Sequence, residues 1–111
     1  NLMQILITEI ERLREELNNT IISLQRAGYE KAKAEYTYRV ALAKELLILR
    51  DRGLPATLTN DVARGNENIA KLKFNRDVAE TNYDATLEKL RATKIELDIV
   101  ERQMEAIRRG E

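Results

Sequence analysis

The sequence contains no histidine, cysteine or tryptophan. Without histidine or cysteine it cannot form Cys/His zinc sites, thiol nucleophiles, disulfide bonds, or Ser–His and Cys–His catalytic pairs. It also contains no glycine-rich phosphate loop, nucleophile elbow or protein-kinase signature. We therefore expect a protein that is not an enzyme and that uses no cofactor and no metal ion.

An excess of charge of either sign is also missing, because 19 Lys and Arg balance 19 Asp and Glu among the 111 residues. A strongly basic or acidic chain would have pointed to nucleic acid, a membrane surface or a disordered tail. The most apolar stretch, residues 2–7, is too short for a membrane span or a signal peptide. We expect one domain, located in the cytoplasm, with no membrane contact.

Glycine and proline are scarce, with four glycines and one proline, and three of these five residues lie within one short window. Because both residues interrupt regular structure, that window divides the chain into two arms. The predicted organisation is a helix over about residues 2–52, a hinge over about 53–65, and a second helix over about 66–109. The hinge residues concerned are Gly53, Pro55 and Gly65.

The ends of these predicted helices carry recognisable signals. Gly53 follows a leucine-rich run ending in arginines, which is typical of a helix C-terminus. Within the hinge, Thr57 or Thr59 would cap a single helical turn that closes at Gly65. Asn66 would cap the second long helix, whose first turn is acidic.

The second arm has the most regular pattern in the sequence. Apolar residues recur in alternating steps of three and four, which is the repeat of a coiled coil. The positions of this stripe, nine of them apolar, are Ile69, Leu72, Arg76, Ala79, Tyr83, Thr86, Leu90, Thr93, Leu97, Val100, Met104 and Ile107. A helix with this pattern packs along a partner helix.

The first arm is less regular. Near its start, the predicted seam comprises Met3, Leu6, Ile10, Leu13, Leu17, Ile21 and Leu24, and a second seam near the hinge comprises Leu42, Leu46 and Leu49. The four-residue steps from position 13 to 17 and 21, and again from 24 to 28 and 32, indicate stutters, which locally unwind a coiled coil. We therefore expect somewhat irregular packing along this arm.

The predicted fold is all-α, a long antiparallel two-helix hairpin of coiled-coil type. A hinge of about a dozen residues makes the two arms antiparallel neighbours. With a simple turn, Leu42 would lie near Arg76, and Gly28 would lie near Leu90.

Several apolar residues fall outside the predicted seam and define a candidate dimer face: Ile22, Val40, Leu47, Leu87, Ile95 and Ile99. A two-helix rod cannot bury such a set, whereas two hairpins packed as a four-helix bundle can. We expect a homodimer. The alternative is that a different protein covers this face.

Four polar residues of the two arms should converge as a polar core layer: Glu35, Arg39, Arg76 and Tyr83. Such a layer either fixes the register of a bundle or binds an anion or small ligand. The structural role is the favoured interpretation. Tyrosines at positions 29, 36 and 83 suit a bundle core better than a base-stacking surface for single-stranded nucleic acid, because glutamates interrupt the surrounding basic residues.

The hinge end provides the candidate partner-binding residues Arg50, Arg52, Leu54, Leu58, Arg64, Lys71 and Lys73. Structured loops on rigid scaffolds often carry function. The leucines would instead cap the end of the bundle if they pack inward, and the two roles are compatible. The charge excess is too small to indicate duplex DNA.

The hinge also carries a resemblance. The segments Arg-Asp-Arg-Gly-Leu-Pro-Ala-Thr-Leu at 50–58, Asp-Val-Ala-Arg-Gly at 61–65, Ile-Ala-Lys-Leu-Lys-Phe at 69–74 and Arg-Asp-Val-Ala-Glu at 76–80 resemble small helical proteins encoded by bacteriophages and prophages of Gram-positive bacteria. The resemblance covers about a third of the chain. It implies a phage accessory protein in the bacterial host cytoplasm, and it transfers no catalytic residue.

Together these observations predict a non-enzymatic accessory protein that binds a macromolecule, most simply a protein, through a helical-hairpin scaffold. One alternative is nucleic-acid or nucleotide binding through the basic hinge end. Another is an architectural spacer in a phage particle.

Overall fold

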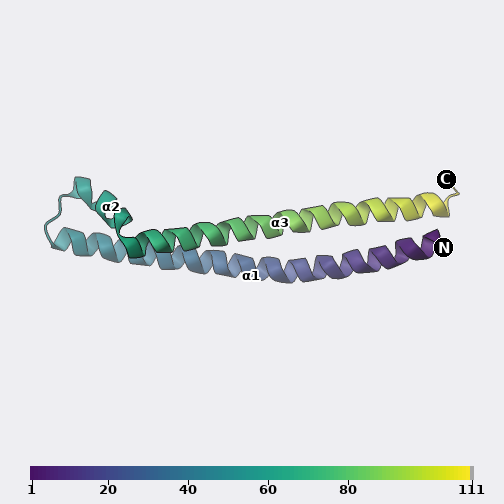
Figure 1. Cartoon of the computed structure of the whole chain (residues 1–111), viewed down its shortest axis with the longest axis horizontal. Helices are drawn as coiled ribbons and strands as arrows, with labels where there is room; N and C mark the ends of the chain where they lie inside the picture. The colour runs from purple at the N-terminus through teal and green to yellow at the C-terminus, as the bar shows by residue number, and fades with distance from the viewer. Residues whose placement is uncertain (111) are drawn as a thin grey trace. The chain divides into compact units, whose positions relative to one another are not determined.

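The computed structural model describes residues 1–110, and these residues form three α-helices and no strand. Helix α1 spans Leu2–Asp51, α2 spans Ala56–Gly65 and α3 spans Glu67–Arg108 (Figure 1). The all-α class expected from the sequence is confirmed.

The chain divides into two compact units. Unit 1 comprises Asn1–Arg26 and Asp84–Glu111, and unit 2 comprises Ala27–Tyr83. Each unit contains one segment of α1 and one segment of α3, and unit 2 also contains α2. The sections below describe the contacts inside each unit.

Helix α1 ends as the sequence predicts. Gly53 has a φ of +88°, a left-handed conformation that favours glycine. The amide of Gly53 donates to the carbonyl of Arg50 at 3.0 Å, and the amide of Leu54 donates to the carbonyl of Leu49 at 3.1 Å. This pair of bonds is the Schellman motif, which satisfies carbonyls that the end of a helix leaves unpaired.

Helix α2 differs from the expected single turn. It is ten residues long, begins directly after Pro55, and has no side-chain cap, so neither Thr57 nor Thr59 acts as one. The Thr59 hydroxyl instead donates to the carbonyl of Pro55 at 2.8 Å, from inside the helix. The φ of Pro55, −58°, already suits a helix start, and no glycine or proline interrupts the chain before Gly65.

Helix α3 begins at the cap predicted from the sequence. The side-chain oxygen of Asn66 accepts hydrogen bonds from the amides of Asn68, at 2.9 Å, and Ile69, at 3.2 Å. These amides belong to the first turn of the helix, where no intrahelical acceptor is present. Asn66 therefore separates α2 from α3 with a single non-helical residue.

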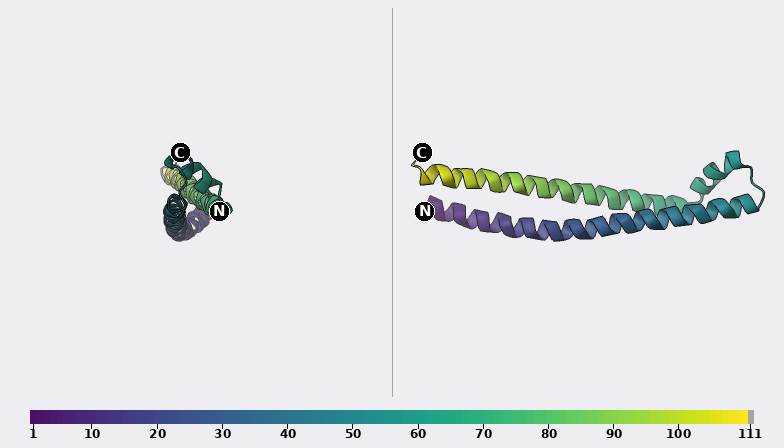
Figure 2. Two further views of the ribbon diagram at one scale, coloured as in Figure 1. Left: turned by 90° about the vertical axis from the view of Figure 1, so that its left-hand side faces the viewer. Right: turned by 180° about the vertical axis from the view of Figure 1, so that it is seen from behind.

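In unit 2, α2 lies beside the C-terminal part of α1 (Figures 1 and 2). Its buried residues are Thr59 and Ala63, whose four-residue spacing places them on one face of the helix. Nη1 of Arg64 donates to the hydroxyl oxygen of Tyr38 on α1 at 3.2 Å. The hinge is therefore a packed helix that runs back along α1.

Because α2 runs back along α1, the pairing of α1 with α3 in unit 2 differs from the expected register by one heptad. Nε of Arg76 lies 3.4 Å from a carboxylate oxygen of Glu35, one heptad away from Leu42, its expected neighbour. A Cβ built on Gly28 would lie 3.5 Å from Cε2 of Tyr83, one heptad before its expected partner on α3. The physical reason is that α2 takes up part of the length of α1, so that α3 starts to pack farther from the C-terminus of α1.

The predicted stripe of α3 is confirmed almost throughout. Eleven of its twelve positions are buried or half-buried, and the exception is Ile107, which is 37% exposed. Ile69 and Thr93 are buried, at 5% and 4% exposure. The 3.5-residue repeat therefore identifies the packed face of this helix, including its polar positions.

The predicted stutters in α1 are wrong. Thr20 is 3% exposed, whereas Ile21 is 39% exposed. The buried residues Leu6, Leu13, Thr20 and Ala27 are spaced by unbroken heptads. Apolarity alone favours Ile21 as the seam residue, but the heptad repeat places the neighbouring Thr20 in the seam.

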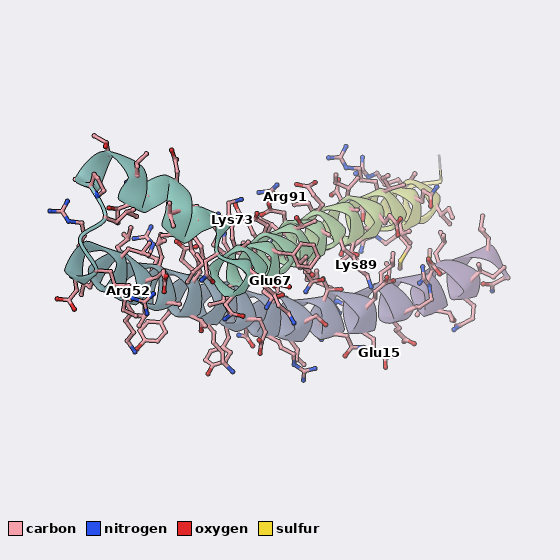
Figure 3. All side chains as sticks on the ribbon, turned by 60° about the vertical axis from the view of Figure 1, so that its left-hand side comes forward. Glu15, Arg52, Glu67, Lys73, Lys89 and Arg91 are labelled. Atoms are coloured by element: carbon pink, nitrogen blue, oxygen red, sulfur yellow. The ribbon has the colours of Figure 1, made fainter. Side chains whose placement is uncertain are left out.

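The charged residues largely pair along their own helices. In unit 1, Arg12 contacts Glu9 at 2.6 Å and Glu16 at 3.1 Å, with spacings of three and four residues. Charged side chains such as Glu15 and Arg91 are exposed and project from the helices (Figure 3). Such surface pairs contribute little to stability, because water screens them, so their main effect is a well-solvated surface.

Candidate functional site

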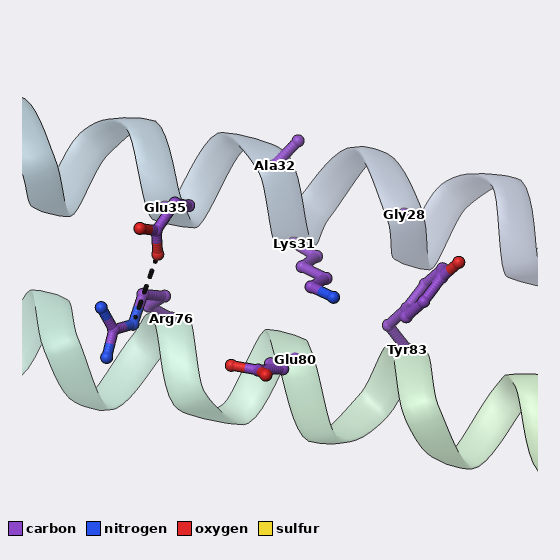
Figure 4. Close-up of a pocket in the computed structure, with 7 residues that line it drawn as sticks. All are labelled: Gly28, Lys31, Ala32, Glu35, Arg76, Glu80 and Tyr83. Atoms are coloured by element: carbon purple, nitrogen blue, oxygen red, sulfur yellow. Dashed lines mark ion pairs between the residues drawn. The ribbon is translucent and has the colours of Figure 1, made fainter.

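Unit 2 contains a cleft of about 490 Å³ between α1 and α3 (Figure 4). Its lining combines small, aromatic and charged side chains: Gly28, Lys31, Ala32, Glu35, Arg76, Glu80 and Tyr83. Three of the four residues predicted to converge as a polar layer therefore line one cleft. The ring of Tyr83 lies against α1 at Gly28, where a Cβ would be 3.5 Å from Cε2 of the ring, an ordinary van der Waals distance.

Arg76 is the most connected residue of this cleft. Besides its contact with Glu35, its guanidinium donates to Asp77 at 3.1 and 3.2 Å and lies 4.7 Å from the ring centre of Tyr38. The hydrogen bond to Asp77 raises the pKa of Arg76, and hydrogen bonds from Lys73 and Arg76 lower the pKa of Asp77. These contacts hold the cation against the two helices rather than leaving it available to a ligand.

A second cation–aromatic contact lies farther along the cleft. Nζ of Lys31 is 4.7 Å from the ring centre of Tyr83. In Figure 4, Lys31 on α1 and Tyr83 on α3 both project into the space between the helices. Such contacts contribute about 0.5–1 kcal/mol at exposed sites.

The expected buried polar layer is not present in that form. The side chain of Arg39 is 76% exposed and pairs with Glu35 at 2.6 Å on its own helix. Arg76 and Glu35 are themselves 24% and 35% exposed. Arg39 follows the buried Tyr38 by one position, about 100° around α1, and therefore lies outside the packed face. Glu35 and Arg76 link the two helices at the edge of an open cleft.

The basic residues of the hinge end do not form one free surface. Arg64 donates to Tyr38, and Lys73 pairs with Asp77 at 3.0 Å. The remaining three are exposed: Arg50, Arg52 and Lys71. Two of the five basic residues on which the nucleic-acid or nucleotide alternative depends are thus engaged within unit 2, which weakens that alternative.

The two hinge leucines have different environments. Leu54 is half-buried just after the end of α1. Leu58 is 50% exposed, and Val62, one turn later on α2, is 47% exposed. Leu54 therefore fits the capping role, and Leu58 lies on an accessible face of α2.

The tyrosines at positions 29 and 36 are not core residues. Tyr29 is 65% exposed and Tyr36 is 68% exposed, whereas Tyr38 is 4% exposed. Two residues correspond to about 200° around a helix, so Tyr36 and Tyr38 lie on opposite faces. The face of α1 that carries Tyr29 and Tyr36, here called the outer seam of α1, comprises Tyr29, Lys33, Tyr36, Val40, Ala43 and Leu47.

Helix α3 has a comparable face in unit 1. Here called the outer face of α3, it comprises Ala85, Glu88, Ala92, Ile95 and Ile99, all exposed, and the two isoleucines are 62% and 50% exposed. Each isoleucine lies two positions after a residue of the packed stripe, and therefore on the opposite side of the helix.

The candidate dimer residues divide between these faces. Val40 and Leu47 lie in the outer seam of α1, and Ile95 and Ile99 lie on the outer face of α3. Ile22 is 58% exposed, and Leu87 is half-buried.

Two exposed residues of unit 2 were missed by the sequence reasoning. Phe74 is 65% exposed and Val78 is 52% exposed. Each follows a residue of the predicted α3 stripe by two positions, Leu72 in one case and Arg76 in the other. A search for a second repeat with this offset would have found both.

Among residues 1–110, no group of three His, Cys, Asp or Glu side chains is placed to hold a metal ion. Within the same residues, no helix combines the length and the apolar character that crossing a membrane requires.

Comparisons with protein-family models, with curated proteins and with solved structures find no match to this chain. Its function must therefore be inferred from its own residues and contacts.

Proposed function

We propose that this chain is a non-enzymatic binding protein, a helical-hairpin scaffold whose outer face of α3 binds an α-helix of another protein. The observation that carries the proposal is the exposure of Ile95 and Ile99 beside small residues on one heptad-spaced face. Helix-in-groove recognition uses apolar anchors at this spacing.

The composition of the outer face of α3 suits a helical ligand. Ala85 and Ala92 are small and exposed, so a second backbone can approach closely at these positions. Ile95 and Ile99 provide branched side chains that pack as knobs into a facing helix. Burying one such side chain fully contributes about 1.5–3 kcal/mol.

The antiparallel contacts inside each unit support the hairpin as the scaffold. In unit 1, Lys89 of α3 lies 3.9 Å from Glu16 of α1, and a shallow cleft is lined by Met3 and Ile10 of α1 together with Met104 of α3. Residues early in α1 thus meet residues late in α3. In unit 2, Glu35, in the C-terminal half of α1, meets Arg76, near the start of α3, which is again the order that antiparallel helices give.

The proposal is tested by affinity capture from a lysate of Gram-positive bacterial cells. We expect the double variant Ile95→Glu/Ile99→Glu to lose a protein that the wild-type chain retains, because charges cannot be buried in an apolar helix contact. The matched control is Asn18→Glu/Gln25→Glu, which adds the same charge at exposed positions on α1, away from the outer face of α3. Identical sets of retained proteins for wild type and the isoleucine variant would refute the proposal.

The phage accessory role and its cytoplasmic location stay predictions from the resemblance at the hinge. They agree with a binding protein that works without catalysis. Among the alternatives, nucleic-acid binding has weaker support, because Arg64 and Lys73 are engaged and the total charge is balanced.

A further inference from the structure

We propose that the outer seam of α1 pairs with the same seam of a second copy of this chain, and that the two α1 helices run antiparallel. This interface lies in unit 2 and on a different helix from the face proposed to bind a partner protein. It therefore does not depend on the proposed function.

The outer seam of α1 has the geometry of a coiled-coil interface. Its six positions are separated by alternating steps of four and three residues from Tyr29 to Leu47. Tyr29, Tyr36 and Leu47 are each at least 65% exposed. The opposite side of α1 is already packed inside unit 2, so this seam remains accessible.

A two-fold antiparallel pairing makes this seam complementary to itself. If the axis passes close to position 38, Tyr36 meets the partner's Val40, and Tyr29 meets the partner's Leu47. At each contact a large ring faces an aliphatic side chain. Lys33 would meet the partner's Ala43, whose small side chain leaves room for the lysine stem to reach solvent.

The charges on one flank favour this orientation. Glu30 and Lys44 each follow a residue of the seam by one position, so they lie along the same flank of α1. Neither takes part in an ion pair inside the described part of the chain, residues 1–110. In an antiparallel pair, equivalent flanks face each other. Glu30 of each copy would then meet the partner's Lys44, so the dimer would contain two such ion pairs.

The opposite flank brings Arg39 close to the partner's Arg39. Arg39 is already paired with Glu35 on its own helix at 2.6 Å, and this neutralises part of the repulsion. Lys33 within the seam also disfavours other registers, because a charged residue at a seam position is tolerated only where it can reach water. The orientation is therefore specified by charge, and the affinity comes from the tyrosines, Val40 and Leu47.

Charge-reversal variants test the inference by light scattering over a range of chain concentrations. We expect the wild-type chain to approach twice its 12.8 kDa mass. Lys44→Glu and Glu30→Lys should each weaken self-association roughly tenfold, since two attractive contacts become repulsive. An equimolar mixture of the two single variants should restore the dimer, because both contacts between positions 30 and 44 are then between opposite charges.

The control Lys94→Glu, a like charge change at an exposed position on α3, should leave the mass unchanged. Circular dichroism of each variant checks that helicity is retained, and Tyr36→Glu gives an independent break of the seam. A wild-type chain that stays monomeric at all concentrations would overturn the inference. So would a dimer that survives Lys44→Glu, or one that Ile95→Glu/Ile99→Glu dissociates instead.

Discussion

At the scale of single residues, Thr20 carries a hydroxyl that is buried without a partner. Its Oγ1 has no hydrogen bond among the described residues, although the residue is only 3% exposed. The buried Thr93 differs, because its hydroxyl donates to the carbonyl of Lys89 at 2.9 Å. An unpaired buried hydroxyl lowers stability, since it loses its bonds to water and gains none in return.

Replacing Thr20 by Val should therefore stabilise the chain by about 1 kcal/mol, because valine has the same shape and similar helix propensity. Urea denaturation at a fixed chain concentration measures the change. Thr93→Val is the matched control, and it should gain less, because it also removes a hydrogen bond. A lower urea midpoint for Thr20→Val would contradict the finding that the Thr20 hydroxyl is buried without a hydrogen-bond partner.

At the scale of elements, the short connection between α2 and α3 depends on one side chain. The amide oxygen of Asn66 accepts two backbone hydrogen bonds at the start of α3. Asn66→Ala should cost about 1 kcal/mol in the free energy of unfolding. Thermal or urea unfolding monitored by circular dichroism provides the measurement.

Thr57→Ala is the control for this prediction. Thr57 lies inside α2, is exposed, and makes no cap, so its replacement should change stability by less than about 0.5 kcal/mol. Equal losses for Asn66→Ala and Thr57→Ala would contradict the observed position of the cap.

The elements also differ in how far the sequence predicts them. The stripe of α3 was predicted because a strict repeat marks both its apolar and its polar positions. In α1, apolarity alone favours Ile21 over Thr20 as the seam residue, whereas the heptad repeat selects Thr20, which is the buried one. Helix α2 was underestimated because threonines inside a helix resemble caps when the sequence is the only guide.

At the scale of the whole molecule, the register of α1 against α3 is the feature that sequence could not supply. Seam residues one heptad apart are chemically similar, so a hairpin can pair in either of two registers with little change in apolar contact. The choice depends on how α2 packs, through contacts such as the one between Arg64 and Tyr38. The same shift explains why Arg76 meets Glu35, whereas Tyr29 and Tyr36 are exposed because they lie on the face of α1 opposite the buried Tyr38.

Cysteine pairs can distinguish the two registers, because the chain has no cysteine of its own. Glu35→Cys/Arg76→Cys should react efficiently with a short bismaleimide. Leu42→Cys/Arg76→Cys, the pair of the simple-turn register, should react poorly, since one heptad is about 10 Å along a helix. Gel mobility after reaction at low chain concentration measures the yield, and the reverse order of yields would contradict the observed register.

Pairing through the outer seam of α1 would determine how many partner-binding faces one assembly carries. If this seam joins two copies, the assembly presents two outer faces of α3 and becomes a bivalent reagent for a helical ligand. A partner that displays its helix repeatedly, on an oligomer or a lattice, would then be held by avidity well beyond the strength of one contact. A solitary helix would bind only with the modest affinity of a single apolar face.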